Sequence, residues 1–444
     1  MKKNLLFLIL SMSIPAILEM LLNTMLGLSD TIMISRFIGK EALTSVGFAN
    51  QIIFALIFIF STFNTGAVAM VSRALGEKDY VKLKKISEQN VNINLLISII
   101  ILFLGYIFNK QIFRIFDIPE QVYNDTIEYF NIVQISLIPM FLSFSFAANL
   151  RGAGNTLTPM IITGIATVIN IIGNFVLILG LGPFPALGIA GAAWATTGSR
   201  YIALFIYIYI IYIKESNIRL EFKFFFDKNI VKPLWNISLP GAIEQTLMQT
   251  SFVVIGVIVS QLETVSEAGY RILIQIESIS FMPAVGMSIA AATLVGKSLG
   301  EKDINKASKV GYLSSGMGMI WGVIVGIFFI LFPDQILSIF TKEIDVINKA
   351  VPVMFFIALN QIGLNFIIVI SGALRGAGDT KGVMINTILR LWLVFVPFSY
   401  VSIVVLNLGI VGVWYAEILS FTIFATALFF RFRSKTWAIL ELTK

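Results

Sequence analysis

The 444-residue sequence contains no cysteine and no histidine. The absence of thiols excludes disulfides and iron–sulfur clusters, and the absence of both residues excludes most zinc sites and the usual haem ligands. Charged residues are scarce at 13% of the chain, whereas apolar residues make up 57%. Soluble domains carry about 25% charged residues, so this composition indicates a chain that lies largely in a membrane.

Long apolar segments recur along the whole sequence, and an apolar helix of about 20 residues is enough to cross a bilayer. Charged residues separate these apolar segments, and the resulting pattern predicts an all-α polytopic membrane protein with twelve transmembrane helices. The expected spans are 6–34, 43–72, 88–109, 122–148, 156–181, 187–213, 235–260, 266–296, 308–332, 346–374, 381–406 and 409–431. Six spans lie on each side of a polar stretch, which predicts an N-lobe (1–213), a cytoplasmic interlobe linker (214–234) and a C-lobe (235–444).

The basic residues are distributed unevenly along the chain. With both termini on the cytoplasmic side, 23 of the 32 lysines and arginines fall in cytoplasmic tails and loops and seven in the opposite loops. The positive-inside rule demands this asymmetry. It explains the net charge of +7 without a nucleic-acid partner, and it predicts a multi-pass protein of the cell (inner or plasma) membrane with both termini cytoplasmic.

Two identical pentapeptides each occur twice, and both pairs are separated by the same interval, which is about half the chain. Leu75–Asp79 (LGEKD) returns as Leu299–Asp303, and Leu150–Gly154 (LRGAG) returns as Leu374–Gly378. The copies follow the second and the fourth span of each half. Because each half holds an even number of spans, we expect two parallel, pseudo-symmetric six-helix lobes related by an axis along the membrane normal.

The repeated pentapeptides resemble helix ends more than binding loops. Arginine and glycine after an apolar span suit a helix C-terminus and a tight turn. A glycine-rich phosphate loop is the alternative, but no Walker pattern or Rossmann context surrounds either LRGAG copy. We interpret both motifs as turns.

Asp30 is the strongest candidate for a functional site, because an ionisable residue inside a membrane span is costly and usually functional. A carboxyl group removed from water holds a proton more firmly and can release it when water or a cation arrives. A structural alternative is that Asp30 only pairs with a base such as Arg200. Asn170 and Asn174 share one helix face, and Thr196 follows a small-residue stretch. Together with Asp30 they would form an all-oxygen shell suited to a hard cation, although asparagine and threonine in membrane spans more often make ordinary interhelical hydrogen bonds.

Acidic residues also occur in the second half. Glu19 recurs as Glu244, one residue beyond the interval of the pentapeptides, and these two glutamates face either the cavity or a partner helix. Glu417 occupies the place of Thr196 at a slightly shorter interval. With Arg390 it suggests mutual neutralisation inside the C-lobe.

The order of these features resembles the multidrug and toxic compound extrusion (MATE) transporters of the bacterial and archaeal NorM or DinF type. The resemblance covers essentially the whole chain and rests on the two parallel halves, the paired LRGAG-(Asn/Asp)-Thr loops, Pro15 fifteen residues before Asp30, and the run Asp30–Met33.

The resemblance implies an antiporter that exports organic, cationic and amphipathic compounds in exchange for Na⁺ or H⁺, by rocking of two lobes about a central cleft. MATE proteins place a cation site on residues that match Asp30, Asn170, Asn174 and Thr196. The amide of Asn174, where DinF-type members often carry an aspartate, favours Na⁺ or either ion. Glu244 matches a NorM glutamate, and Pro15 a proline linked with bending of the first helix.

The resemblance leaves a second ion site in the C-lobe open, because Asn360, Gln361 and Asn365 stand where NorM-like members carry an acid. We assign Glu19, Glu244, Asn360, Gln361 and Arg200 to the substrate cavity or a secondary site. We expect a monomer without a cofactor other than the coupling ion.

The residues of the sequence also bear on three other possible functions. A lipid-linked oligosaccharide flippase of the same wider superfamily would gain support if Arg200 and Arg271 lined the cleft. An enzyme is not expected, because the sequence has no paired-aspartate protease signature and no HExxH motif. A passive channel would not need a buried titratable acid.

Overall fold

The computed structural model describes residues 2–115, 118–214, 220–221 and 223–440, and these residues are helical with short connections and no β-strand. The expected all-α membrane fold is therefore confirmed. Ten helices are long and apolar enough to cross a membrane, and a bent pair makes an eleventh. The remaining predicted span, 43–72, falls on two successive helices, α2 and α3, which meet at Asn64.

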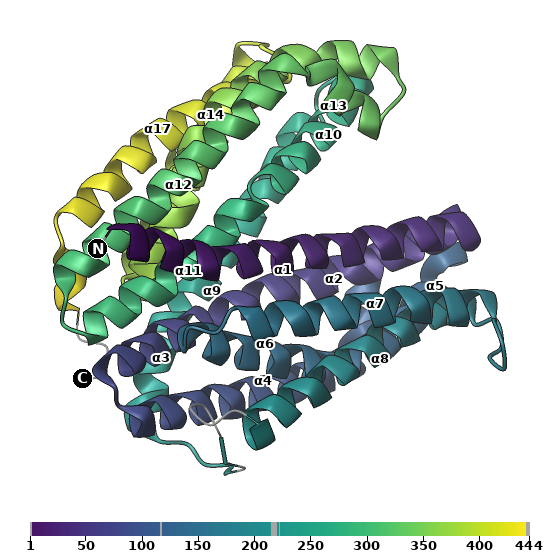
Figure 1. Cartoon of the computed structure of the whole chain (residues 1–444). Helices are drawn as coiled ribbons and strands as arrows, with labels where there is room; N and C mark the ends of the chain where they lie inside the picture. Colours follow the sequence, from purple (N-terminus) through teal and green to yellow (C-terminus); the bar gives the residue numbers. More distant parts are fainter. Residues whose placement is uncertain (1, 116–117, 215–219, 222, 441–444) are drawn as a thin grey trace. The chain divides into compact units, whose positions relative to one another are not determined.

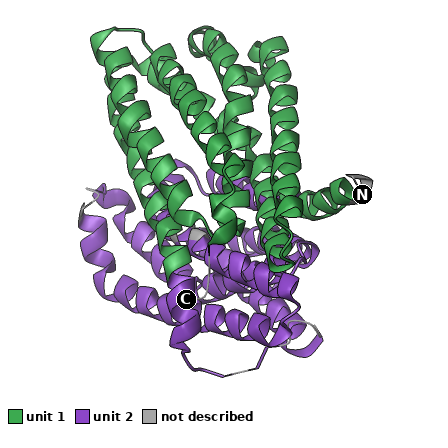
Figure 2. Ribbon diagram, turned by 90° about the vertical axis from the view of Figure 1, so that its left-hand side faces the viewer, with its two compact units in different colours: residues 1–17, 236–442 green, residues 18–235, 443–444 purple. Residues whose placement is uncertain are grey.

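The chain divides into two compact units, coloured separately in Figure 2. Unit 1 comprises residues 1–17 and 236–442, and unit 2 comprises residues 18–235 with 443–444. The second division lies next to the predicted start of the C-lobe at residue 235. The first division falls inside the first helix, two residues after Pro15 at Ile17, so the first helix belongs to both units.

The helices of unit 2 follow one another along the chain with short connections (Figure 1). They are α1 (Lys2–Phe37) from residue 18, α2 (Lys40–Phe63), α3 (Thr65–Glu77), α4 (Tyr80–Ile115), α5 (Glu120–Gln134), α6 (Leu137–Gly152), α7 (Leu157–Leu179), α8 (Gly188–Ile208) and a π-helical segment η1 (Tyr209–Lys214). The pair α5 and α6 forms one span bent by 45°. Pro139, near the start of α6, lacks the N–H that would bond back into α5, which explains the break.

Unit 1 repeats this order. Its elements are the first part of α1, α9 (Lys228–Val259) from residue 236, α10 (Thr264–Ser280), α11 (Met282–Gly300), α12 (Ile304–Leu331), α13 (Pro333–Phe340), α14 (Ile344–Gly376), α15 (Thr380–Leu389), the π-helical segment η2 (Arg390–Phe395), α16 (Val396–Tyr400), a second π-helical segment η3 (Val401–Val405), α17 (Val411–Arg433) and a 3₁₀ turn η4 (Thr436–Ile439). Pro397, which cannot donate an i→i−4 bond, lies two residues after η2.

The helix surfaces show the pattern expected of a membrane protein. Bulky apolar side chains such as Phe103, Val253 and Leu331 are more than 60% exposed. Many polar side chains are buried instead. In a bilayer this arrangement is favourable, because lipid solvates apolar groups while polar groups need partners inside the protein.

The start of α1 is held within unit 1 by close packing. Ile9 and Met12 belong to the same buried cluster as Ala284 and Met287 of α11. A Cβ atom on Gly286 would lie 2.6 Å from the backbone nitrogen of Ile17. Glycine at that position therefore lets α11 and α1 approach closely.

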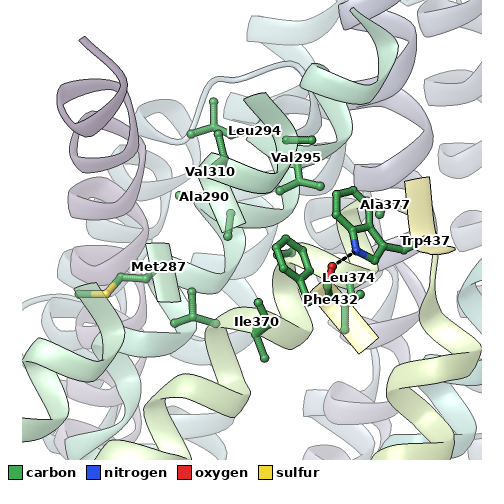
Figure 3. Close-up of a cluster of buried hydrophobic side chains, with 14 of the residues drawn as sticks. Met287, Ala290, Leu294, Val295, Val310, Ile370, Leu374, Ala377, Phe432 and Trp437 are labelled. Atoms are coloured by element: carbon green, nitrogen blue, oxygen red, sulfur yellow. Dashed lines mark hydrogen bonds between the residues drawn. The ribbon is translucent and has the colours of Figure 1, made fainter. Parts of the chain in front are cut away.

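The same cluster includes the last described turn, η4, in unit 1 (Figure 3). Trp437 is 1% exposed, stacks on Phe432 with ring centroids 4.7 Å apart, and donates its indole N–H to the Phe432 carbonyl at 2.7 Å. Lys435 adopts a left-handed conformation with φ of 57° that turns the chain back towards α17.

The predicted linker is partly fastened to unit 2; its residues 215–219 and 222 lie outside the described part. Polar side chains of α4 bond to the linker backbone. Glu88 accepts from the Glu221 N–H at 3.0 Å, and Gln89 donates to the Phe225 carbonyl at 3.0 Å. Lys223 and Lys84 hydrogen-bond the Glu221 carboxylate and lower its pKa to about 2.

Both repeated pentapeptides form helix-ending turns, as predicted. In the LRGAG copies the final glycines, Gly154 and Gly378, have φ of 88° and 91°. The next residue in each copy donates its N–H to the carbonyl of Leu150 or Leu374, at 2.8 and 2.9 Å. This is the Schellman pattern, in which a left-handed residue closes the helix. The LGEKD copies do the same with left-handed Lys78 and Lys302.

Candidate functional site

The four residues predicted to form the cation site come together in unit 2. Asp30 lies near the end of α1, Asn170 and Asn174 lie one turn apart on α7, and Thr196 lies on α8. The two asparagines are 0% exposed and Thr196 is 5% exposed. Burial of this many polar groups away from lipid requires that they bond to one another.

Glycines allow α7 and α8 to pack closely enough for that contact. A Cβ atom on Gly191 would lie 2.5 Å from the backbone oxygen of Leu177, and one on Gly173 would lie 3.1 Å from the Cβ of Ala195. Any side chain at Gly191 would therefore push α8 away from α7. The small residues next to Thr196, noted in the sequence, explain how its hydroxyl reaches the α7 amides.

A chain of hydrogen bonds links the four side chains. The Nδ2 of Asn174 donates to Asp30 Oδ1 at 2.5 Å and to Asn170 Oδ1 at 3.3 Å. The Nδ2 of Asn170 donates to the Thr196 hydroxyl at 3.2 Å. Thr196 also interacts with the Asp30 carboxylate. The network orients one carboxylate towards two amides and a hydroxyl.

One oxygen of this network has no partner among the described residues. Asn174 Oδ1 is buried and accepts no hydrogen bond. A buried amide oxygen without a donor is costly, and a cation or a water next to Asp30 would satisfy it. The donor set fits a hard cation, because carboxylate, amide and hydroxyl oxygens are its preferred ligands. No group of three Asp, Glu, His or Cys side chains that could hold a metal ion occurs in the described part of the chain.

Arg200 and Tyr129 complete the surroundings of Asp30. Arg200 interacts electrostatically with Asp30, but the described residues show no contact ion pair between them. Its Nη1 instead donates to the Ser136 hydroxyl at 2.6 Å. Tyr129 is 3% exposed and bonds to Asn50 of α2. Sequence reasoning missed Tyr129 and Asn50, although a polar amide inside the apolar span 43–72 was a usable signal for Asn50.

Glu19 and Glu244 each form a buried ion pair with a repeated arginine. In unit 2, Glu19 Oε1 accepts from Arg151 Nη2 at 2.5 Å and from the Thr163 hydroxyl at 3.5 Å. In unit 1, Glu244 Oε1 accepts from Arg375 Nη2 at 2.7 Å and from the Thr387 hydroxyl at 2.8 Å. These two Glu–Arg–Thr triads are copies of one another, separated by the interval of the duplication to within one residue.

The triads correct the view that the LRGAG motifs are only turns. Their arginines bond across to α1 or α9, and this tertiary contact was not predicted. For Glu19 and Glu244 the helix-pairing alternative describes the observed contacts. Both carboxylates keep a buried second oxygen, Oε2, that accepts no hydrogen bond from any residue that the structure describes.

In unit 1 the predicted residues separate into two polar groups. Asn360 Nδ2 donates to Glu417 Oε2 at 2.9 Å. Gln361 points elsewhere and accepts from the Ser280 hydroxyl at 3.0 Å. Asn365 donates to the backbone carbonyl of Gln361 at 2.6 Å. The side chains of Asn360 and Gln361 therefore do not share one site.

Arg390 and Glu417 share one cluster but make no contact ion pair among the described residues. The Arg390 guanidinium lies over the Phe421 ring, 4.5 Å from its centroid, and donates to Ser420 at 3.5 Å. A second buried acid, Glu277 of α10, interacts with both Arg390 and Glu417. Glu277 was missed, although the rule that singled out Asp30 applies equally to an acid in the span 266–296.

Comparison with known proteins agrees with this architecture. The family model MatE matches residues 15–176 and again residues 240–401, so its two copies are separated by the same interval as Glu19 and Glu244. A Thermotoga maritima protein named "Probable multidrug resistance protein NorM" is 29% identical over 438 residues, which cover 97% of this chain and 92% of that one.

Solved structures show the same fold at lower sequence identity. The crystal structure of MATE in complex with MaD3S superimposes with a TM-score of 0.91 at 20% identity, covering 97% of this chain and 96% of that one. The crystal structure of MATE in the bent conformation gives 0.90 at 21% identity, covering 96% and 94%. With the family model matched over both halves of the sequence, the chain belongs to the MatE family of membrane transporters.

Proposed function

We propose that this transporter is a multidrug efflux antiporter that exports organic, cationic and amphipathic compounds in exchange for Na⁺ or H⁺. Its relative in Thermotoga maritima is named as a probable multidrug resistance protein, which supports the efflux assignment. The observation that carries the coupling is the Asp30 network. It sets one carboxylate without a contact ion pair beside an unpartnered amide oxygen inside a membrane span.

The network suits reversible cation binding. Asp30 supplies the negative charge, and Asn174, Asn170 and Thr196 supply neutral oxygens. A proton would bind to the carboxylate itself, whereas Na⁺ would also use Asn174 Oδ1 and the Thr196 hydroxyl. Arg200 balances the charge of Asp30 when the site is empty, so the bound cation is held weakly enough to leave.

Cation binding at Asp30 would weaken a contact of α1 and so would affect the conformation of this helix. The charged carboxylate accepts the short bond from Asn174, and neutralisation weakens that bond. Pro15 cannot donate to the Ser11 carbonyl, so α1 bends most easily there. The chain passes from unit 1 to unit 2 just after this proline. We propose that α1 thereby connects cation binding to alternating access, through different affinities of the two states.

The test uses purified protein in liposomes loaded with a fluorescent organic cation. Efflux is followed under an imposed Na⁺ gradient and, separately, under an imposed pH gradient. We expect one gradient to drive efflux in the unchanged protein and Asp30→Asn to reduce that efflux to the level seen without the gradient, because the amide carries no charge for a cation to neutralise. Glu263→Gln is the matched control, because Glu263 is an exposed acid paired with Lys349.

Two outcomes would contradict the proposal in different ways. If neither gradient drove efflux, the antiport assignment would be wrong. If a gradient drove efflux equally well in Asp30→Asn and in the unchanged protein, the coupling site would lie elsewhere.

The flippase alternative receives no support from its two arginines. Arg271 is paired on its own helix with Glu267 at 2.7 Å, and Arg200 bonds to Ser136 beside Asp30. A pyrophosphate group would need several free cationic donors in one place. Failure of the liposomes to move lipid-linked oligosaccharide would exclude this function directly.

We also propose that the protein lies in the plasma membrane with both termini cytoplasmic. The absence of cysteine makes the test simple, because single cysteines can be introduced at Lys78 and at Gly182. A membrane-impermeant maleimide added to intact cells should label the second position and leave the first unlabelled. The reverse pattern would invert the topology.

A further inference from the structure

The cluster of Glu277, Glu417 and Arg390 in unit 1 contains two acids but only one base. Glu277 is 5% exposed, Glu417 is 9% exposed and Arg390 is 8% exposed. The three side chains come from α10, α17 and η2, and they interact electrostatically with one another. A guanidinium stays charged in proteins, so one ionised carboxylate balances Arg390 and the other leaves an excess negative charge.

Neighbouring groups do not supply the missing positive charge. Arg271 is exposed and bonded to Glu267, and Tyr270 of α10 is a neutral phenol beside both acids. Glu244 of α9 also interacts with Arg390, but it is balanced by Arg375 at 2.7 Å. The cluster itself must therefore neutralise one carboxylate, because an uncompensated buried charge is very costly.

The hydrogen bonds of Glu277 and Glu417 are compatible with a proton on one of these two carboxylates. Glu417 accepts one bond, from Asn360 at 2.9 Å. Glu277 Oε1 is buried and accepts no hydrogen bond of good geometry within the described part of the chain, although the Trp414 indole interacts with this carboxyl group. Two interacting carboxyls with one balancing base take up a single proton that belongs to the pair. Sodium is less suitable, because only one amide accompanies the two acids.

We propose that unit 1 binds one exchangeable proton, shared by Glu277 and Glu417 and balanced by Arg390. This site is separate from the Asp30 network, which lies in unit 2. Protonation converts one carboxylate into a carboxylic acid, and deprotonation returns the proton to water. The proposal depends on the proposed antiport only for the use of this proton in transport.

The test counts protonated carboxyl groups by infrared difference spectroscopy on the purified full-length protein. We expect Glu277→Gln and Glu417→Gln each to remove the signal of one protonated carboxyl. In either variant the remaining glutamate balances Arg390 and needs no proton. The double variant should lose no more signal than either single variant. Arg390→Gln should gain one protonated carboxyl, since both glutamates must then be neutral.

Asp30→Asn provides a background that keeps the native cluster intact. In that variant the shared protonated carboxyl should persist, and Glu263→Gln should leave the spectrum unchanged. The proposal is overturned if both single glutamine variants keep the full signal or if their losses add. If the glutamine variants do not fold, loss of every protonated carboxyl signal in Asp30→Asn overturns it. Because no step of this measurement requires transport, failure of the antiport assignment would leave its result readable.

Discussion

The two units share their helix-ending loops but differ in the placement of buried charge. Both contain a Glu–Arg–Thr triad with the same bonding partners, Glu19–Arg151–Thr163 in unit 2 and Glu244–Arg375–Thr387 in unit 1. Both also contain a serine, Ser199 or Ser420, that donates to the carbonyl three residues earlier at 2.9 Å. The duplicated scaffold has been kept in both halves.

The acids outside the triads do not follow the repeat. The interval that relates Glu19 to Glu244 places Ile255 where Asp30 stands, and the interval that relates the last span of each half places Glu417 where Thr196 stands. Arg200 corresponds to Phe421, yet unit 1 still has a buried guanidinium, because Arg390 lies over that ring. Unit 2 thus holds one acid, Asp30, beside one base, Arg200. Unit 1 holds two acids, Glu277 and Glu417, beside one base, Arg390. The difference teaches that a common scaffold carries two chemically distinct sites.

Removing the arginine of either triad should have the largest effect on stability. Arg151→Met and Arg375→Met each leave a buried glutamate uncompensated, which costs about 3–5 kcal/mol. Thermal unfolding in detergent should show similar losses for the two variants. Adding Glu19→Gln or Glu244→Gln should recover part of each loss, because the uncompensated charge is removed. A large loss in one unit with none in the other would contradict the equivalence of the triads.

Trp437 tests the packing of the last described turn of unit 1, with the 64% exposed Ile213 of unit 2 as an exposed control. Trp437→Ala empties a position in the core shown in Figure 3 and should lower stability by about 3–5 kcal/mol. Ile213→Ala should have little effect. Equal melting temperatures of Trp437→Ala and the unchanged protein would show that this turn does not stabilise unit 1.

Gly152 and Gly376 occupy equivalent positions with unequal space. A Cβ atom on Gly376 would lie 2.0 Å from the backbone oxygen of Ala292, whereas one on Gly152 would meet the Val71 side chain at 2.9 Å. Overpacking costs about 1–3 kcal/mol, and backbone yields less than a side chain. Gly376→Ala should therefore lower the melting temperature more than Gly152→Ala. The opposite order would mean that unit 1 relaxes more easily than its packing indicates.

The smallest effect is expected at the left-handed lysines of the LGEKD turns. Lys78 and Lys302 have φ of 58° and 60°, and a left-handed conformation costs a residue with a side chain about 1 kcal/mol relative to glycine. Lys78→Gly and Lys302→Gly should each stabilise the protein slightly and equally. Unequal melting shifts would show that one turn is strained beyond its backbone.

The sequence, with the family resemblance, was sufficient for the membrane class, the duplication and the grouping of Asn170, Asn174 and Thr196 with Asp30. Apolar length and the positions of charged residues report directly on lipid exposure. The duplication was recognisable because the interval between identical peptides can be measured without knowledge of the tertiary structure. The asparagines on α7 were recognisable because four residues separate points on one helix face.

The tertiary partners of the charged residues were not recognisable. Arg151 and Arg375 satisfied a local rule for helix ends, and that rule concealed their contacts with glutamates far away in the sequence. Glu277 and Arg390 come together only because α10, α17 and η2 pack around one point. Pro397 lies two residues after the π-helical segment Arg390–Phe395 and is a local signal of irregular helix that the span assignment did not use.

The central claim is that Asp30 couples a cation to substrate, and its most direct test is the affinity of purified protein for a fluorescent organic cation across a series of Na⁺ concentrations and pH values. Coupling is reciprocal, so a cation that favours substrate release must weaken substrate binding. The account predicts that affinity falls as Na⁺ or proton concentration rises, and that Asp30→Asn removes this dependence. An affinity in Asp30→Asn that still fell in parallel with the unchanged protein would contradict it.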